Sequence, residues 1–129
     1  MSIIDSYDES RPLISPESFY TPGNIAKKCI VTFSCKVLEN IFENYECQKE
    51  AHVGTANGDV PVYSLIQEGE KILFYMSPVG SAVAGAMMDE ISCVTGVRHF
   101  VVFGSCGSLN QEATAGKIIV PTESYRDEG

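Results

Sequence analysis

The chain has 129 residues, of which 44% are hydrophobic and 20% are charged, and its formal net charge is −8. This length suits one globular domain rather than two, and the apolar content is high enough to bury a core, which excludes a largely disordered chain. The lysines and arginines are few and scattered. Nucleic-acid binding is therefore not expected, because phosphate backbones are bound by clustered basic residues.

The five cysteines are odd in number and include neither a CxxC pair nor a histidine at metal-ligand spacing. This pattern fits neither a disulfide framework nor a zinc site, so we expect no metal, reduced thiols and a cytoplasmic location. The acidic N-terminus is unlike a signal peptide, and no apolar run approaches the ~18 residues that span a bilayer. Neither secretion nor membrane insertion is predicted.

Residues 1–28 are predicted to form an N-terminal arm. Pro12, Pro16 and Pro22 interrupt this segment too often for a long helix or strand. Ser15 can act as an N-cap with Pro16 at the first helical position, which predicts one short helical turn.

A regular domain is expected over residues 29–129. It begins with a short β-branched and aromatic run at 30–33, which is typical of a buried strand. Apolar residues then recur at spacings of three and four over 37–45, which predicts an amphipathic helix. Two further strands, 48–54 and 60–66, are separated by turn-forming residues and predict a hairpin.

The second half of the pattern alternates strands and helices. The apolar run 72–76 predicts a central strand buried on both faces, and 81–95 predicts a helix that Gly96 ends. The apolar runs 100–103 and 118–120 predict two more strands, whose side chains should be buried and help define the core.

This alternation predicts an α/β fold with a mixed, mainly parallel sheet flanked by helices. The chain stops soon after the last predicted strand and before any helix that would cover it. A sheet ending there has an open edge and an uncovered apolar face. We therefore expect the domain to be truncated.

Three segments follow predicted strands, at the positions where open α/β sheets bind ligands: 77–81, 104–108 and 121–124. In the middle segment, two glycines allow close approach of a ligand to the backbone, and Ser105 adds a hydroxyl beside N–H groups. Small polar anions favour such loops, although a tight turn without a ligand explains the same residues. The GxGxxG fingerprint of dinucleotide binding is missing.

Other polar residues give weaker signals. Arg126 lies among carboxylates, so it can present a fixed guanidinium to an anion or belong to an exposed ion-pair cluster. His52 and His99 have no Ser or Cys nucleophile at motif spacing, and Cys106 is either a reactive thiol or a small packing residue. No catalytic residue is identified from this pattern.

Three stretches taken together resemble the nucleoside phosphorylase family, which includes purine nucleoside and uridine phosphorylases. They are FYMSPVGSAVAGAMMDEI (74–91), VVFGSCGSL (101–109) and GKIIVPTESYRDEG (116–129). The most specific feature is the Gly-Ser-Cys-Gly loop followed, at the right distance, by Arg-Asp-Glu-Gly. The resemblance covers residues 29–129 and implies a mixed α/β sandwich around a partly closed sheet. It also implies that this domain is truncated after about half of its length.

Members of this family are pentosyltransferases of nucleoside salvage, including purine salvage, and they exchange a nucleoside's base for phosphate. The resemblance implies a nucleoside and inorganic phosphate as ligands, with phosphate as co-substrate and no other cofactor. Together with the strand-end positions, it predicts three phosphate-binding residues: Gly104, Ser105 and Arg126. It predicts five residues lining the phosphate and ribose region: Ser77, Gly80, Ser81, Cys106 and Gly107.

Two departures from the family pattern weaken the case for tight phosphate binding. The family's glycine-containing loop after the first strand is replaced by residues 32–35, and the usual phosphate-binding arginine is replaced by Val102. Lys36, Arg98 or Arg126 can compensate for that arginine, and the sequence does not select among them.

Three hypotheses follow. The first is a phosphorylase-type half that is inactive alone and works as a homo-oligomer or with a complementary C-terminal half. The second is a nucleosidase that uses water in place of phosphate, motivated by Phe33 and Val102. The third is a noncatalytic binding or oligomerisation module. Base and sugar preference are not encoded in a recognisable pattern.

Overall fold

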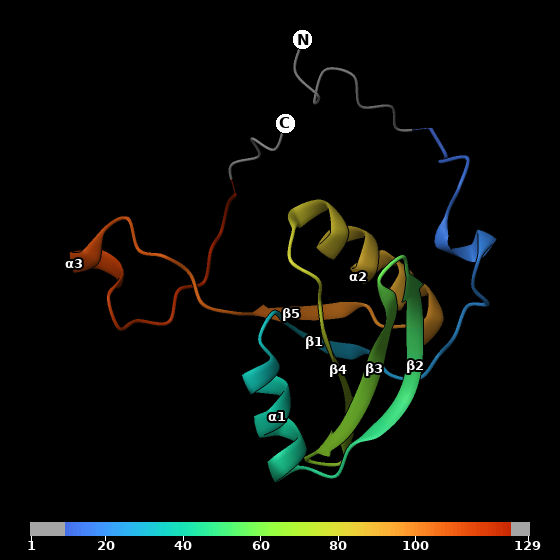
Figure 1. Ribbon diagram of the computed structural model, residues 1–129, viewed down its shortest axis with the longest axis horizontal. Coiled ribbons are helices and arrows are strands. Elements are labelled where there is room, and N and C mark those ends of the chain that lie inside the picture. The colour runs from blue at the N-terminus through green and yellow to red at the C-terminus, as the bar shows by residue number, and fades with distance from the viewer. Residues whose placement is uncertain (1–9, 125–129) are drawn as a thin grey trace.

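A computed structural model describes residues 10–124 of the chain (Figure 1). In chain order the elements are η2 (Pro16–Ser18), β1 (Lys28–Thr32), α1 (Cys35–Asn44), β2 (Gln48–Thr55), β3 (Gly58–Gln67), β4 (Glu70–Met76), α2 (Ser81–Thr95), β5 (His99–Phe103) and α3 (Gln111–Thr114). The strands form one sheet in the order β2-β3-β4-β1-β5. Within residues 10–124, no helix combines the length and apolar character that crossing a membrane requires.

The sheet is mixed, as predicted. β1 pairs in parallel with β4 and β5, whereas β3 pairs antiparallel with β2 and β4. Parallel pairing is thus confined to one side of the sheet rather than dominating it. The reason is local, because two-residue turns join β2 to β3 and β3 to β4, and such turns allow only antiparallel pairing. In the second turn Glu68 and Gly69 have φ values of 52° and 80°, typical of a type I′ hairpin.

The main core lies between the sheet and α2. Met87 and Ile91 of α2 pack against a cluster that includes Cys29, Val31 and Tyr75. Successive residues of a strand point to opposite faces, so Phe74, next to Tyr75, faces the other side. The predicted burial of β4 on both faces is confirmed, since Leu73, Phe74 and Tyr75 are all 0% exposed.

A smaller aromatic cluster attaches α1 to the opposite face. The Phe42 ring lies 4.9 Å from Tyr63 and 5.7 Å from Phe74, centroid to centroid, and the Tyr63 and Phe74 rings are 5.7 Å apart. No residue of α1 is fully buried. These ring contacts therefore help to attach the helix to the sheet, alongside the half-buried side chains of Val37, Leu38 and Ile41.

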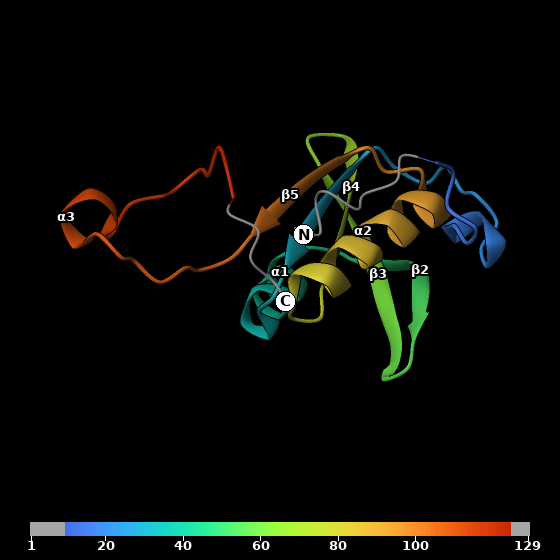
Figure 2. The same cartoon turned by 90° about the horizontal axis from the view of Figure 1, so that it is seen from above.

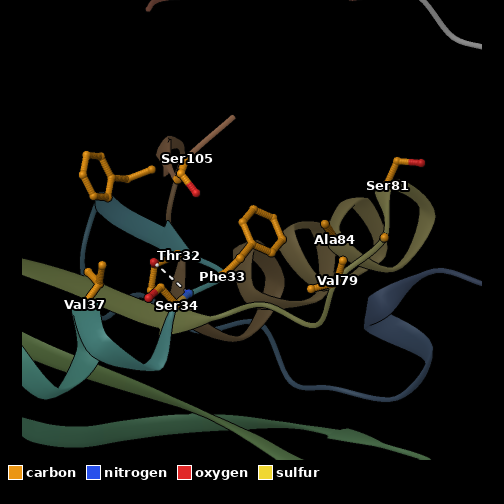
Figure 3. Close-up of a pocket in the computed structure, with 11 residues that line it drawn as sticks. Thr32, Phe33, Ser34, Val37, Val79, Ser81, Ala84 and Ser105 are labelled. Atoms are coloured by element: carbon orange, nitrogen blue, oxygen red, sulfur yellow. Dashed lines mark hydrogen bonds between the residues drawn. The ribbon is translucent and has the colours of Figure 1, made fainter. Parts of the chain in front are cut away.

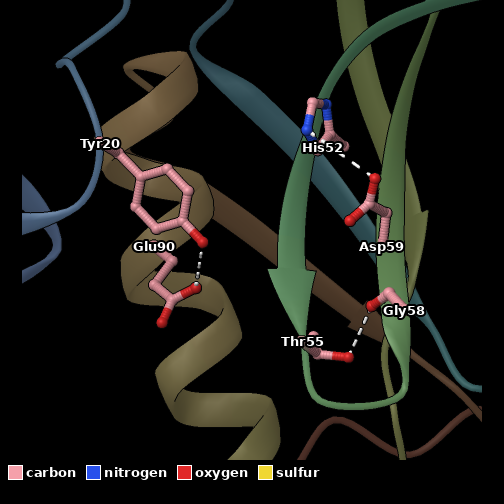
Figure 4. Close-up of polar contacts among 6 residues, drawn as sticks. All are labelled: Tyr20, His52, Thr55, Gly58, Asp59 and Glu90. Carbon is pink, nitrogen blue, oxygen red and sulfur yellow. Dashed lines mark hydrogen bonds and ion pairs between the residues drawn. The ribbon is translucent and has the colours of Figure 1, made fainter.

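The segment before β1 lies along α2. The predicted turn is present as η2, with Ser15 as N-cap and Pro16 at its start. Farther along, Gly23 N–H donates to Cys93 O at 2.9 Å, and the Tyr20 hydroxyl donates to Glu90 Oε2 at 3.3 Å (Figure 4). These bonds fix the segment against the C-terminal half of α2.

Two sequence expectations about the end of the sheet are wrong. Residues 118–120 form no strand, and Ile118 and Val120 are 96% and 81% exposed. β5 forms, but its last three residues are more than half exposed rather than buried. After β5 the chain leads away from the sheet, as Figures 1 and 2 both show. Among the described residues, β5 therefore has no second neighbouring strand, and residues 118–120 have no strand to pair with. Apolar strands need such partners to be buried.

Tyr75→Phe is expected to raise the free energy of unfolding by about 1 kcal/mol, because the buried Tyr75 hydroxyl has no hydrogen-bond partner among the described residues. Burial also raises the pKa of Tyr75, which keeps the hydroxyl neutral. Urea denaturation would measure the change. Tyr20→Phe is the matched control and should destabilise slightly, since that hydroxyl donates to Glu90. A loss of stability in Tyr75→Phe would contradict the expectation.

Candidate functional site

A cavity of about 550 Å³, termed the main cavity for its place at the ends of the parallel strands, is shown in Figure 3. A hollow of about 600 Å³ lies away from these strand ends, and its lining includes Cys47, Ser64 and Lys71. The main cavity lies between the starts of α1 and α2 and the end of β5. Eleven residues line it: Thr32, Phe33, Ser34, Val37, Val79, Gly80, Ser81, Ala84, Phe103, Gly104 and Ser105. Three separate strand-end segments therefore share one cavity.

Hydrogen bonds hold the floor of this cavity. Thr32 is buried at the end of β1, and its Oγ1 accepts from Ser34 N–H at 3.2 Å. Thr32 O accepts from Ser77 N–H at 2.8 Å, which ties the end of β1 to the end of β4. The strand ends consequently stay in register where the cavity begins.

Two helices begin at the cavity. α1 starts after Ser34, and α2 starts after Gly80, whose φ of 132° is a conformation that favours glycine. The first N–H groups of a helix have no partner within the helix, and the helix dipole places partial positive charge there. The cavity is thus lined by groups that attract an anion or a polar oxygen.

No ionisable side chain lines the cavity among the described residues. Lys36 is exposed in α1 and is not part of the lining. Arg98 precedes β5 at the opposite end of the sheet, where its Nη1 donates to Ser92 Oγ at 3.3 Å. Arg126 lies outside the described residues. Neither Lys36 nor Arg98 therefore lines this cavity. Neither of them replaces the family's phosphate-binding arginine, whose position Val102 occupies.

The structure brings together four of the predicted site residues, Gly80, Ser81, Gly104 and Ser105. This agrees with the strand-end argument, because segments far apart in sequence meet where parallel strands end.

The other predicted lining residues lie beside the cavity. Ser77 is buried, its Oγ donates to Pro78 O at 2.9 Å, and it lines a neighbouring hollow of about 330 Å³. Cys106 and Gly107 line a third hollow, of about 430 Å³, formed with the segment after β5. For Cys106 and Gly107 the direction of the chain explains the separation, because the segment after β5 turns away from the sheet (Figure 1).

Sequence reasoning missed most of the apolar lining. Val37 and Ala84 belong to the first turns of α1 and α2, and Phe103 directly precedes the predicted segment 104–108. Val79 was included, since it lies within the predicted segment 77–81. A usable signal was available, because a helix that begins directly after a strand end presents its first turn to the same cavity.

Ionisable groups elsewhere do not form a catalytic cluster with this cavity. Cys29 is buried in the core, and burial raises the pKa of its thiol to about 12. His52 and Asp59 lie on the hairpin with Nε2 and Oδ2 3.9 Å apart (Figure 4). In the described part of the chain, no three His, Cys, Asp or Glu side chains are arranged to hold a metal ion.

The sequence profile of the phosphorylase superfamily matches residues 27–129. The chain belongs to this superfamily. The resemblance to nucleoside phosphorylases drawn from the strand-end motifs is thereby confirmed. No curated protein matches the sequence as a significant relative. In this superfamily member, all eleven residues that line the main cavity lie within the region that the profile covers.

Proposed function

We propose that the cavity binds a nucleoside and takes part in cleaving its N-glycosidic bond. Superfamily membership supports this class of reaction in general. The observation that carries the proposal is the convergence of two helix starts with Gly104 and Ser105 in one cavity. These groups supply hydrogen-bond donors for sugar hydroxyls or an oxyanion within largely apolar walls, the composition expected of a small-molecule site.

In the phosphorolytic version, an oxygen of inorganic phosphate bonds to C1′ of the sugar while the C1′–N bond breaks. The base leaves with the electron pair and takes up a proton. The transition state carries positive charge on the sugar and negative charge on the phosphate and base, so positioning and electrostatics provide the catalysis. Ser105 and the backbone N–H groups would hold phosphate, with no further cofactor.

In the hydrolytic version, water takes the place of phosphate. Its oxygen bonds to C1′, its proton is released, and the departing base is protonated. The lack of an ionisable side chain in the described lining favours this version, because phosphate sites in proteins normally include a cation.

The proposal includes a partner. Val101, Val102 and Phe103 are 61%, 54% and 56% exposed, and within residues 10–124 β5 pairs along one edge only. Exposed apolar edge strands favour pairing with another chain. We propose that a second copy or a complementary C-terminal half covers this edge in the cytoplasm and that turnover requires it. The alternative is a noncatalytic module that associates through β5 and binds no nucleoside.

Ser105→Ala tests the site. Base release would be measured from purine and pyrimidine nucleosides, with and without phosphate, for the chain alone and with a complementary C-terminal half of a superfamily member. We expect activity in the complemented protein and a loss of up to about tenfold in Ser105→Ala, since one hydrogen bond to a sugar hydroxyl or to the attacking oxygen contributes about 0.5 to 1.5 kcal/mol.

Ser108→Ala is the matched control. Ser108 lies in the same segment, but its hydroxyl shares a hydrogen bond with Thr114 instead of lining the main cavity. Base release that needs phosphate would select phosphorolysis, and release without phosphate would select hydrolysis. No release in either preparation would contradict the proposed function.

A further inference from the structure

The Phe33 side chain stands inside the main cavity. It follows β1 directly, lines the cavity and remains 39% exposed. Figure 3 shows its ring between the Ser105 side of the cavity and the side formed by Val79 and Ala84. A Cβ added to Gly104 would lie only 3.8 Å from Phe33 Cδ2. The ring therefore lies close enough to Gly104 that a side chain added there would touch it.

This position conflicts with anion binding. The two helix starts and the Gly104–Ser105 backbone attract an anion, but the face of a phenyl ring carries partial negative charge and offers no donor. A hydrated phosphate must lose water to enter beside the ring. No cation of the described lining compensates for that loss, and the chain as a whole is acidic.

We propose that Phe33 sets the acceptor specificity of this cavity. Its ring keeps inorganic phosphate away from the backbone donors and leaves space for uncharged molecules, such as water and the sugar of a nucleoside. The inference rests on the proposed nucleoside site and adds the residue that decides between phosphate and water. Removing the ring opens the donors of Gly104, Ser105 and the α1 start to an anion.

Titration of the full chain with inorganic phosphate tests this directly, by calorimetry or by amide chemical shifts. Phe33→Gly should bind phosphate at least about tenfold more tightly than the unmodified protein, a difference that either method resolves. Phe33→Leu should stay close to the unmodified protein, because it keeps apolar bulk at the same place. Phe19→Gly is the matched control, since Phe19 is 71% exposed and lies outside the cavity.

The outcomes separate this inference from the proposed function. Equal phosphate affinity in Phe33→Gly and the unmodified protein would overturn the inference, even if nucleosides are cleaved. A rise in phosphate affinity confined to Phe33→Gly would support it, even if no variant cleaves a nucleoside. Should Phe33→Gly fail to fold by circular dichroism, Phe33→Ala replaces it, and the same comparison decides.

Discussion

Gly23→Ala is expected to lower the free energy of unfolding by about 3 kcal/mol or more. A Cβ at this position would lie 2.0 Å from Val94 O and 2.8 Å from the Val94 carbonyl carbon. Both atoms belong to the backbone of α2, so no side chain can rotate to make room. Relief of the clash requires the segment before β1 to separate from α2, which breaks the Gly23–Cys93 and Ile25–Thr95 hydrogen bonds.

Urea denaturation followed by circular dichroism would measure this loss. Gly85→Ala is the matched control, because Gly85 lies within α2 and a Cβ there would meet nothing within 4 Å. Alanine is favoured over glycine in a helix, so Gly85→Ala should stabilise the protein by about 0.5 to 1 kcal/mol. Equal denaturation midpoints for Gly23→Ala and the unmodified protein would show that the segment does not pack against α2 as described.

The elements that sequence predicted well are those specified by local patterns. The helix at 81–95 and its end at Gly96 are confirmed, because a 3.6-residue apolar stripe and a left-handed glycine at the C-cap are local signals. The hairpin formed by β2 and β3 is confirmed for the same reason.

The features that sequence predicted poorly depend on partners distant in the chain. An apolar run such as 118–120 becomes a strand only where a neighbouring edge can receive it, and no described strand is available there. Gly23 gave no signal either, because its importance arises from Val94, which lies far along the sequence. Such contacts cannot be read from a pattern of residues around one position.

In the candidate site, too, sequence predicted the features set by local patterns and missed those that depend on distant partners. Gly80 and Ser105 were predicted because small and hydroxyl residues after strands are visible in the sequence, and both line the cavity. Phe33 was recognised only as a departure from the family's loop. Its place against Gly104 depends on the parallel pairing of β1 with β5, which puts Thr32 opposite Phe103 and so brings the two following segments together.

Phe74→Ala is the second change expected to have a large effect, with a loss of about 3 to 5 kcal/mol in the free energy of unfolding. Phe74 is 0% exposed in the central strand β4, and its ring contacts both Phe42 of α1 and Tyr63 of β3. Truncation leaves a cavity below α1, a helix that has no fully buried residue of its own. The helix should therefore loosen before the rest of the sheet unfolds.

The consequence reaches the candidate site, because α1 carries Ser34 and Val37 at its start and both line the main cavity. Hydrogen exchange should show α1 amides losing protection in Phe74→Ala while those of α2 keep theirs. Phe42→Ala provides the control: Phe42 is 42% exposed, so its loss should cost less in global stability yet expose the same α1 amides. If α2 lost protection together with α1 in both variants, the aromatic cluster would not be the separate attachment that holds this wall of the cavity in place.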